Sequence, residues 1–415
     1  MKKIPAIFFL ITSFLSSFSQ PVIKGRVVNA ANGEPVAGSS VFISNSSSGT
    51  TSDKDGYFEL KNVPSGKHEL VISCIGYETN VFPFSSQQLP LKLKVEMTVK
   101  VKELRSVTVE PFAEEGWAKW GRMFMEHFIG RTPGAAQCRI KNEKAIRFRF
   151  YKKSNRVVAY CDEPVILENK ALGYRIVYQL EDFEVNYKTG VTFYAGYPLF
   201  EELDKSRKGL AGKWQKNRDK AYFGSMQHFM YSLYHDSLLS EGFEVRRVVR
   251  LPNTEKERVK QLYRPARMTR PTGNGIVFSI EEKESGSSYP RDSADYYEKV
   301  LRQKDYFELV GKDLLSRDSL ITREEEGYKV LFFTDYLYIT YKYEQEDMEY
   351  VQQSEENRPR YFQRSYIRLS NGNPVAVDKQ GNYYPPQEVF SSAYWGWSEK
   401  MADCLPVDYK PSGKP

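Results

Sequence analysis

Histidine and cysteine are scarce in this sequence of 415 residues, with four of each. No histidine is followed by glutamate three residues later, and HExxH and CxxC motifs are absent; the histidines are His68, His127, His228 and His235. Because catalytic zinc needs three protein ligands and an open position, these residues do not assemble a zinc site. We therefore expect no metal and no other cofactor.

Motifs of other catalytic classes are also missing. There is no G-x-S-x-G nucleophile elbow and no glycine-rich phosphate loop. Neighbouring carboxylates such as Glu181-Asp182 and Glu201-Glu202 do occur, but a catalytic pair is recognised by a separation of ~5 to 10 Å in space. We therefore predict no catalytic residue and favour a protein that is not an enzyme, with an unrecognised secreted peptidase or glycosidase as the alternative.

Long hydrophobic runs are absent after the first twenty residues. At the N-terminus, Lys2 and Lys3 precede an apolar run over residues 4–18, and small residues lead up to the Ser19-Gln20 bond. This order is typical of a secretory signal peptide, here residues 1–19, and a retained membrane anchor is the alternative. We expect an exported chain without a transmembrane segment, in the periplasm or at the outer-membrane or cell surface, with no nucleic-acid partner.

An exported chain meets oxidising conditions that permit disulfides. Cys74 lies in an apolar strand and is interpreted as a small core residue. Cys138 and Cys161 flank a predicted hairpin, and closing that loop would contribute ~3 kcal/mol. The sequence makes this pair a possible disulfide without proving it.

The net charge of +7 is small for the length but unevenly spread. Residues 205–270 hold 16 Lys or Arg against 6 Asp or Glu, whereas residues 344–356 hold 6 acids and no base. The basic stretch suits anionic glycans or lipid head groups, but charge blocks more often only solvate a surface, which we favour.

The segment TSDKDGYFELKN, residues 51–62, resembles a calcium loop in its spacing. Asp53 and Asp55 precede Gly56, but Thr51 and Asn62 occupy the first and last positions, where a calcium loop has carboxylates. Asp and Gly favour chain reversal, so we predict a turn. The flanking residues alternate apolar and polar in short runs separated by turn signals, a pattern that predicts a β-sandwich.

Residues 20–99 resemble the carboxypeptidase regulatory-like domain, a seven-stranded sandwich similar to transthyretin. The matching features are Gly25, Gly33-Glu34-Pro35-Val36, Val41, Gly49, Asp53 to Gly56, Gly66 and Ile75-Gly76-Tyr77. The resemblance implies a non-catalytic accessory module of envelope proteins of the Bacteroidota type, found beside peptidase domains or ahead of outer-membrane transporters.

After a charged linker at residues 100–111, residues 112–415 predict a larger β-rich α+β domain, so the chain is mainly β with some α. Helices are expected over residues 117–128, 220–239 and 293–301, and patterns elsewhere, including residues 259–263, predict strands. This part is similar to an uncharacterised extension that follows the sandwich in similar exported proteins. The features matched are Phe128-Ile129-Gly130, Cys138, Ile166-Leu167-Glu168-Asn169, Leu172-Gly173-Tyr174 and Tyr394-Trp395-Gly396.

The motif AYWGW brings Tyr394, Trp395 and Trp397 together beside a glycine. Such rings form stacking platforms for sugars or peptides, but they also fill cores, where each buried ring contributes ~2 to 3 kcal/mol. They are the candidate ligand-binding residues, with the core interpretation favoured. The predicted function is binding or scaffolding of a glycan, a peptide or another envelope protein; an accessory role for an outer-membrane transporter is a further alternative.

Overall fold

The computed structural model describes residues 22–100, 110–204, 209–263, 291–325, 327–353 and 358–413. The predicted signal peptide with its Ser19-Gln20 cleavage site lies outside the described residues, as does most of the predicted linker. Among the described helices, none combines the length and apolar character needed to cross a membrane.

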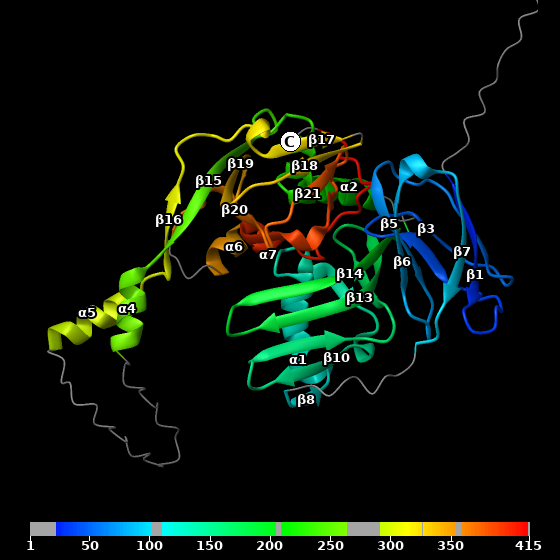
Figure 1. Ribbon diagram of the computed structural model, residues 1–415, viewed down its shortest axis with the longest axis horizontal. Coiled ribbons are helices and arrows are strands. Elements are labelled where there is room, and N and C mark those ends of the chain that lie inside the picture. The colour runs from blue at the N-terminus through cyan, green and yellow to red at the C-terminus, as the bar shows by residue number, and fades with distance from the viewer. Residues whose placement is uncertain are drawn as a thin grey trace, which may run out of the picture.

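Residues 22–100 form a sandwich of two sheets, drawn in blue in Figure 1. One sheet has the order β4-β1-β7 and the other β3-β2-β5-β6, which confirms the seven strands predicted. On β4, Phe58 and Leu60 point into the core while Tyr57 and Glu59 face outward. The strands are β1 (Ile23–Asn29), β2 (Ser40–Ile43), β3 (Gly49–Thr51), β4 (Tyr57–Leu60), β5 (Lys67–Ser73), β6 (Asn80–Ser85) and β7 (Leu91–Met97).

The aspartate segment closes a turn between β3 and β4. The Oδ1 atom of Asp53 accepts hydrogen bonds from the backbone N–H groups of Asp55 at 2.9 Å and Tyr57 at 2.8 Å. Gly56 adopts a φ of +79°, a left-handed conformation that favours glycine. The carboxylate of Asp53 therefore serves the backbone turn that the sequence predicts.

The chain next builds a seven-stranded sheet around the long hairpin of β13 and β14. The predicted aromatic helix is present as α1 (Trp117–Phe124) with a further helical turn, Met125–Ile129, and its Phe124 and Phe128 are fully buried against the sheet. The strands are β8 (Phe112–Glu115), β9 (Cys138–Ile140), β10 (Arg147–Tyr151), β11 (Arg156–Tyr160), β12 (Val165–Asn169), β13 (Tyr174–Asn186) and β14 (Val191–Glu202).

Two further sheets share a separate core, which is built around a helix. Their orders are β16-β15-β19-β20-β23 and β17-β18-β21-β22. The helix is α3 (Met226–Tyr234), whose Phe229, Met230 and Leu233 are fully buried in that core. The strands are β15 (Phe243–Pro252), β16 (Tyr306–Val310), β17 (Ile321–Glu325), β18 (Tyr328–Leu331), β19 (Tyr336–Gln345), β20 (Phe362–Leu369), β21 (Val375–Asp378), β22 (Tyr383–Tyr384) and β23 (Val389–Ala393).

Two local predictions in this region are wrong. The helix expected over residues 220–239 is divided into α2 (Leu210–Tyr222) and α3, because Gly224 turns the chain with a φ of +78° and Ser225 caps α3 by accepting a hydrogen bond from His228 N. The strand expected over residues 259–263 belongs to α4 (Thr254–Leu262), where Asn253 caps the first turn.

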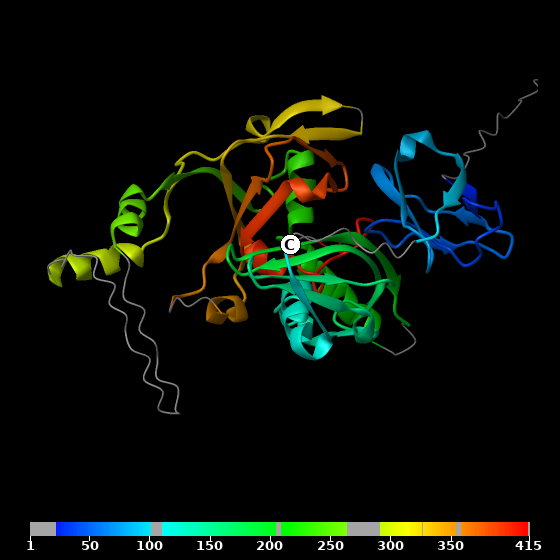
Figure 2. The same cartoon turned by 60° about the horizontal axis from the view of Figure 1, so that its bottom comes forward.

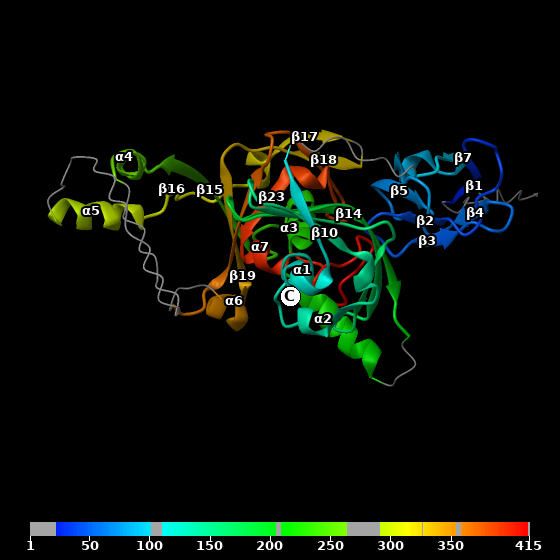
Figure 3. The same ribbon diagram turned by 90° about the horizontal axis from the view of Figure 1, so that it is seen from below.

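Figures 1 and 3 show α4 and α5 (Arg291–Leu301) projecting beyond the ends of β15 and β16, away from the rest of the molecule. The helix α5 matches the helix expected over residues 293–301. Val259 of α4 and Val300 of α5 are almost completely buried, so this projection has a small buried contact of its own.

The last part of the chain joins the two cores. After α6 (Met348–Gln353), β20 to β23 and α7 (Tyr394–Ser398), residues 399–413 turn back to the seven-stranded sheet, and we call them the C-terminal return. Met401, Ala402 and Leu405 enter the core of that sheet, and Met401 N donates to Phe128 O at 3.2 Å. Residues 112–415 thus contain two cores linked by this return.

The turn at Gly56 generates a stability prediction for the mature chain. We expect Gly33→Ala, at a φ of +72° with open space around it, to cost about 1 kcal/mol of unfolding free energy from backbone strain alone. Gly56→Ala should cost about 1–3 kcal/mol more, because its Cβ would collide with the carbonyl oxygen of Val27. Urea unfolding, followed by near-UV circular dichroism, measures the unfolding free energy of both variants. Equal losses of that free energy would show that the Val27 carbonyl moves aside without cost.

Candidate functional site

The sandwich is joined to the seven-stranded sheet through main-chain contacts. Ser46 pairs with Leu199 of β14 in a parallel bridge, Asn45 N donates to Pro198 O at 2.7 Å, and Phe200 N donates to Ser46 O at 3.0 Å. A small apolar cluster lies beside these bonds, with Phe42 and Val71 of the sandwich packed on Leu199. The two parts therefore meet in a continuous backbone and apolar contact.

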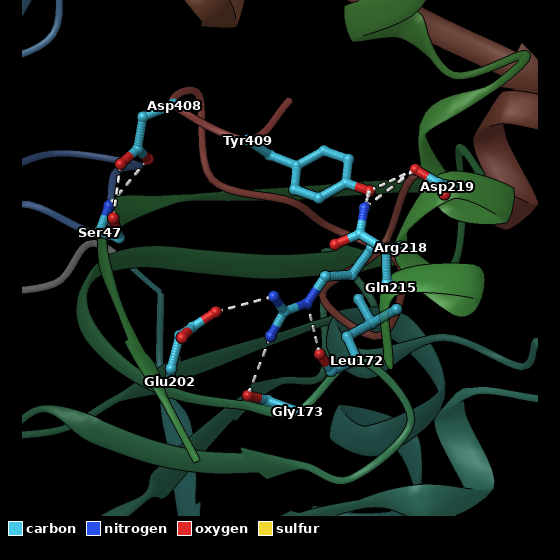
Figure 4. A network of polar contacts seen from close by, with 9 residues as sticks. All are labelled: Ser47, Leu172, Gly173, Glu202, Gln215, Arg218, Asp219, Asp408 and Tyr409. Carbon is cyan, nitrogen blue, oxygen red and sulfur yellow. Dashed lines mark hydrogen bonds and ion pairs between the residues drawn. The ribbon is translucent and has the colours of Figure 1, made fainter. Parts of the chain in front are cut away.

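The C-terminal return makes a second connection to the sandwich, as the views in Figures 2 and 3 show. Val407 N donates to Asn45 O at 2.7 Å, and the carboxylate of Asp408 accepts hydrogen bonds from both the backbone and the hydroxyl of Ser47. Figure 4 shows Asp408 and Ser47 facing each other. The return is thus held between the sandwich and α2.

A buried arginine anchors α2 beside this connection. Figure 4 shows the Arg218 guanidinium donating to Leu172 O at 2.7 Å, to Gly173 O at 3.3 Å and to Glu202 Oε1 at 2.8 Å. It also lies 3.9 Å from the ring centre of Tyr174. Because only 6% of Arg218 is exposed, these partners compensate its lost hydration.

The residue after Arg218 anchors the end of the return. The Oδ1 atom of Asp219 accepts hydrogen bonds from the Tyr409 hydroxyl at 2.6 Å and from Ser412 N at 2.9 Å, as Figure 4 shows for the tyrosine. These hydrogen bonds hold the pKa of Asp219 below its ordinary value against the opposing effect of burial. The carboxylate is therefore charged at neutral pH and fixes the tail.

A cavity of about 550 Å³, which we call the large cavity, lies where the sandwich, the start of α3, the β21–β22 hairpin and the C-terminal return meet. Its apolar wall includes Phe84, Met226 and Leu405. The polar groups that line it are Lys67, His68, Glu69, Asp378, Tyr383, Glu399 and Asp403. An apolar pocket of this size with a few convergent polar groups is a typical small-ligand site.

Two carboxyl groups of the C-terminal return line this cavity and have pKa values shifted toward neutral pH. Glu399 Oε1 accepts a hydrogen bond from Met226 N, the first residue of α3, at 3.1 Å. Burial raises the pKa of Glu399 to about 7, and burial raises that of Asp403 to about 6. Groups with such perturbed pKa values gather at functional sites.

Three other polar residues of the lining already have contacts within the protein. Asp378 accepts hydrogen bonds from Gln380 N and Asn382 N within its hairpin turn, and burial raises its pKa. His68 Nε2 lies 3.1 Å from Pro64 O, and burial lowers its pKa. Lys67 projects over the Tyr328 ring at 3.5 Å. These three residues therefore shape the cavity, and their polar groups already have partners within the protein.

The predicted aromatic motif lies in and beside the second core. Tyr394 and Trp395 are 5% and 2% exposed, and Trp395 Nε1 donates to Gly224 O at 2.8 Å. Trp397 is half-buried and its Nε1 donates to Gln353 Oε1 at 3.1 Å. Tyr394 and Trp395 are therefore packed in the second core, while Tyr394 and Trp397 also line a smaller cavity, and a ligand-binding role for the three rings stays a prediction.

The predicted bridge between Cys138 and Cys161 is not formed, and both residues carry free thiols. Cys138 pairs with Asn169 at the far end of β12, whereas Cys161 lies before Val165 at its near end. The five residues of β12 span ~13 Å at ~3.3 Å per residue, which places the pairing partner of Cys138 far from the end of β12 that follows Cys161. A disulfide needs Cα atoms within ~7 Å, so this register keeps the thiols apart.

Comparison with known proteins identifies the N-terminal domain. Residues 23–109 match the CarboxypepD_reg-like domain family. The chain carries a carboxypeptidase regulatory-like domain. The match covers the sandwich and the start of the following segment, and no curated protein matches the chain.

Solved structures give only distant likenesses to this chain. A cohesin–X-dockerin complex of Acetivibrio cellulolyticus is 23% identical, with a TM-score of 0.17 over 19% of this chain and 58% of that one. The chain thus spans little more than half of that structure. A Bacteroides fragilis protein of unknown function is 8% identical, with a TM-score of 0.16 over 86% of this chain and 93% of that one. At TM-scores below 0.5, neither likeness assigns a fold or a function.

Glu399 generates a prediction about pH. Because burial raises its folded-state pKa, the stability that it contributes is present at pH 4.5 and is lost as the pH rises through about 7. We expect Glu399→Gln, which keeps an acceptor for Met226 N, to raise the unfolding free energy by about 1–2 kcal/mol at pH 8 and to leave it unchanged at pH 4.5.

Glu388→Gln is the control, and its expected effect on the unfolding free energy at pH 8 has the opposite sign. Hydrogen bonds from Asn371 and Asn373 lower the pKa of Glu388, so this change should destabilise the protein at pH 8. Chemical denaturation at both pH values measures the two variants. An equal effect of Glu399→Gln at pH 4.5 and pH 8 would contradict a buried, titrating carboxylate at position 399.

Proposed function

We propose that this protein is an exported, non-catalytic binding protein of the cell envelope, and that its large cavity receives a segment of a peptide or glycan. The carrying observation is that the regulatory-like domain closes one side of a cavity of about 550 Å³ instead of standing apart from the rest of the chain. The apolar N-terminal segment supports export to the periplasm or the outer surface.

The lining suits an organic ligand with both polar and apolar groups. Phe84, Met226 and Leu405 offer apolar surface, while Glu69, Glu399 and Asp403 offer hydrogen-bond acceptors. The cavity walls come from parts of the chain that are distant in sequence, so a ligand would contact both the sandwich and the C-terminal return. Binding of such a ligand would also favour the docked position of the sandwich.

A hydrolase is the second candidate, because Glu399 and Asp403 carry pKa values of about 7 and about 6 in one cavity. Carboxyl groups that titrate near neutral pH are suited to general acid–base catalysis. Turnover of peptide or glycan substrates that disappears in both Glu399→Gln and Asp403→Asn would establish this function in place of binding alone.

A cavity-filling variant tests the binding function. Ala376 lines the large cavity, so Ala376→Trp should block it, and Ala31→Trp, at an exposed position of the sandwich, is the matched control. We expect a peptide or glycan-fragment library to contain ligands that stabilise the mature protein and the control by about 2.7 kcal/mol at a hundredfold excess over Kd.

The blocked variant should lose that stabilisation while keeping its own fold, as judged by circular dichroism. Thermal unfolding with and without ligand gives the readout. A ligand that stabilises Ala376→Trp as much as the control binds outside the large cavity, and this would overturn the proposed site.

A further inference from the structure

The five-stranded sheet of β16, β15, β19, β20 and β23 has an outer face, opposite the face that packs on the second core. On β19, Leu337 and Ile339 point into that core, and on β20 Ile367 does the same. The residues that alternate with them point outward. We call this side the tyrosine–arginine face, after the five residues at its centre, which are Arg246, Tyr338, Arg364, Tyr366 and Arg368.

Two tyrosines lie side by side at the centre of this face. The register of β19 and β20, which Figure 1 shows as neighbours, places Tyr338 directly opposite Tyr366. Their ring centres are 5.1 Å apart. On the other side of Tyr338, the register of β15 places Arg246 opposite it. Both tyrosines are half-buried, so part of each residue remains accessible from solvent.

Cations outnumber acids among the outward residues of these five strands. The acids are Glu244 and Glu308, and both are paired. Glu308 Oε1 lies 2.9 Å from the Arg250 guanidinium, and Glu244 lies 2.9 Å from Arg246 and 3.5 Å from Lys342. The outward cations are Arg246, Arg250, Lys342, Arg364 and Arg368, so the face has a formal net charge of +3, five minus two.

Arg364 and Arg368 keep most of their hydrogen-bond donors for another partner. Arg368 Nη1 donates to Ser370 O at 3.4 Å, and its guanidinium lies 4.8 Å from the ring centre of Phe390. Arg364 Nη2 is 3.8 Å from Glu346 Oε1, too far for a hydrogen bond. Because a guanidinium has five N–H donors, both arginines have donors to offer an incoming anion.

We propose that the tyrosine–arginine face binds an acidic glycan, a linear polymer of sugars that carry carboxylate groups. Arg364 and Arg368 are four residues apart on β20 and therefore ~13 Å apart, with Tyr366 between them. A polymer lying along β20 would meet a guanidinium, an aromatic ring and a second guanidinium in turn. Guanidinium groups pair with carboxylates through two parallel hydrogen bonds, and the tyrosine rings offer surfaces for sugar rings to stack on.

The charge and the chemistry of the face favour this partner over others. The net positive charge attracts a polyanion, and Arg246 and Arg250 belong to the basic stretch at residues 205–270. None of the five central residues is aliphatic, which favours a soluble polymer over insertion into a lipid surface. None of them lines the large cavity, so this inference goes beyond the proposed function and does not depend on it.

The test compares polygalacturonate, which has one carboxylate per sugar, with its methyl ester, a neutral polymer of the same backbone. Biolayer interferometry on the mature chain measures both, with alginate and hyaluronate as further uronic-acid polymers. At a salt concentration of about 50 mM we expect polygalacturonate to bind about tenfold more tightly than the ester, or more. Binding should weaken severalfold at about 300 mM, because salt screens charges at an exposed surface.

Substitutions on the two faces of the sheet locate the binding. Arg364→Gln and Arg368→Gln should each weaken polygalacturonate binding about tenfold, because each removes a bidentate partner of a carboxylate. Arg247→Gln is the matched control, since Arg247 lies opposite Leu337 on the other face and pairs with Asp335. Tyr338→Ala should weaken binding, whereas Tyr338→Phe should keep it, because the ring is retained. Circular dichroism checks the fold of each variant.

The remaining outcomes would overturn the inference. Equal affinity for polygalacturonate and its ester, or no effect of either Arg364→Gln or Arg368→Gln, would exclude pairing with carboxylates at this face. Binding that Ala376→Trp abolishes would place the glycan in the large cavity instead. Binding of phosphatidylglycerol vesicles through the two arginines, without binding of any uronic-acid polymer, would identify a membrane surface as the partner. Binding of no polymer at low salt would reject the acidic glycan and leave the large cavity untouched.

Discussion

The packing of the C-terminal return against the seven-stranded sheet is the contact on which the rest of the architecture depends. Met401, Ala402 and Leu405 are buried in that core, so the return is held by apolar burial before any polar contact is made. From this base Val407 and Asp408 reach the sandwich. Without the return, the sandwich would lose the hydrogen bonds of Val407 and Asp408 and keep its contacts with β13, β14 and the β21–β22 hairpin, and the large cavity would lose one wall.

Burying acidic side chains in that wall opposes folding. Glu399 and Asp403 lie next to the apolar residues that anchor the return, and their raised pKa values reflect the cost of charging them there. A core built only for stability would place apolar residues at these positions. Arg218 shows the contrast, because its buried charge has three hydrogen-bond partners and an aromatic ring, whereas at Asp403 the effect of burial outweighs the hydrogen bond from Thr132.

The sequence predicts the parts of this fold that local signals determine. The sandwich follows from period-two alternation and from Asp53 and Gly56, whose turn needs only neighbouring atoms. The break between α2 and α3 was missed because Gly224 and Ser225 are tolerated inside a helical pattern until tertiary packing sets their conformation. The site itself has no local signal: Glu399 and its partner Met226 are 173 residues apart, and nothing in the stretch EKMADC distinguishes buried acids from solvated ones.

The contacts of the regulatory-like domain with the rest of the chain differ from those of a separate accessory module. As a separate accessory it would touch the following residues through a linker alone, but here Ser46 extends the edge of β14 and Asn45 accepts a hydrogen bond from the C-terminal return. Main-chain bonds at Asn45 and Ser46 help to fix the orientation of the sandwich, and side-chain contacts such as that of Asp408 with Ser47 add to them. The polar groups of the large cavity are then divided among the β21–β22 hairpin, a wall carried by the sandwich and a wall carried by the return. A ligand that contacts both walls gains affinity only when the sandwich is docked, so binding and domain docking are coupled by the same free energy.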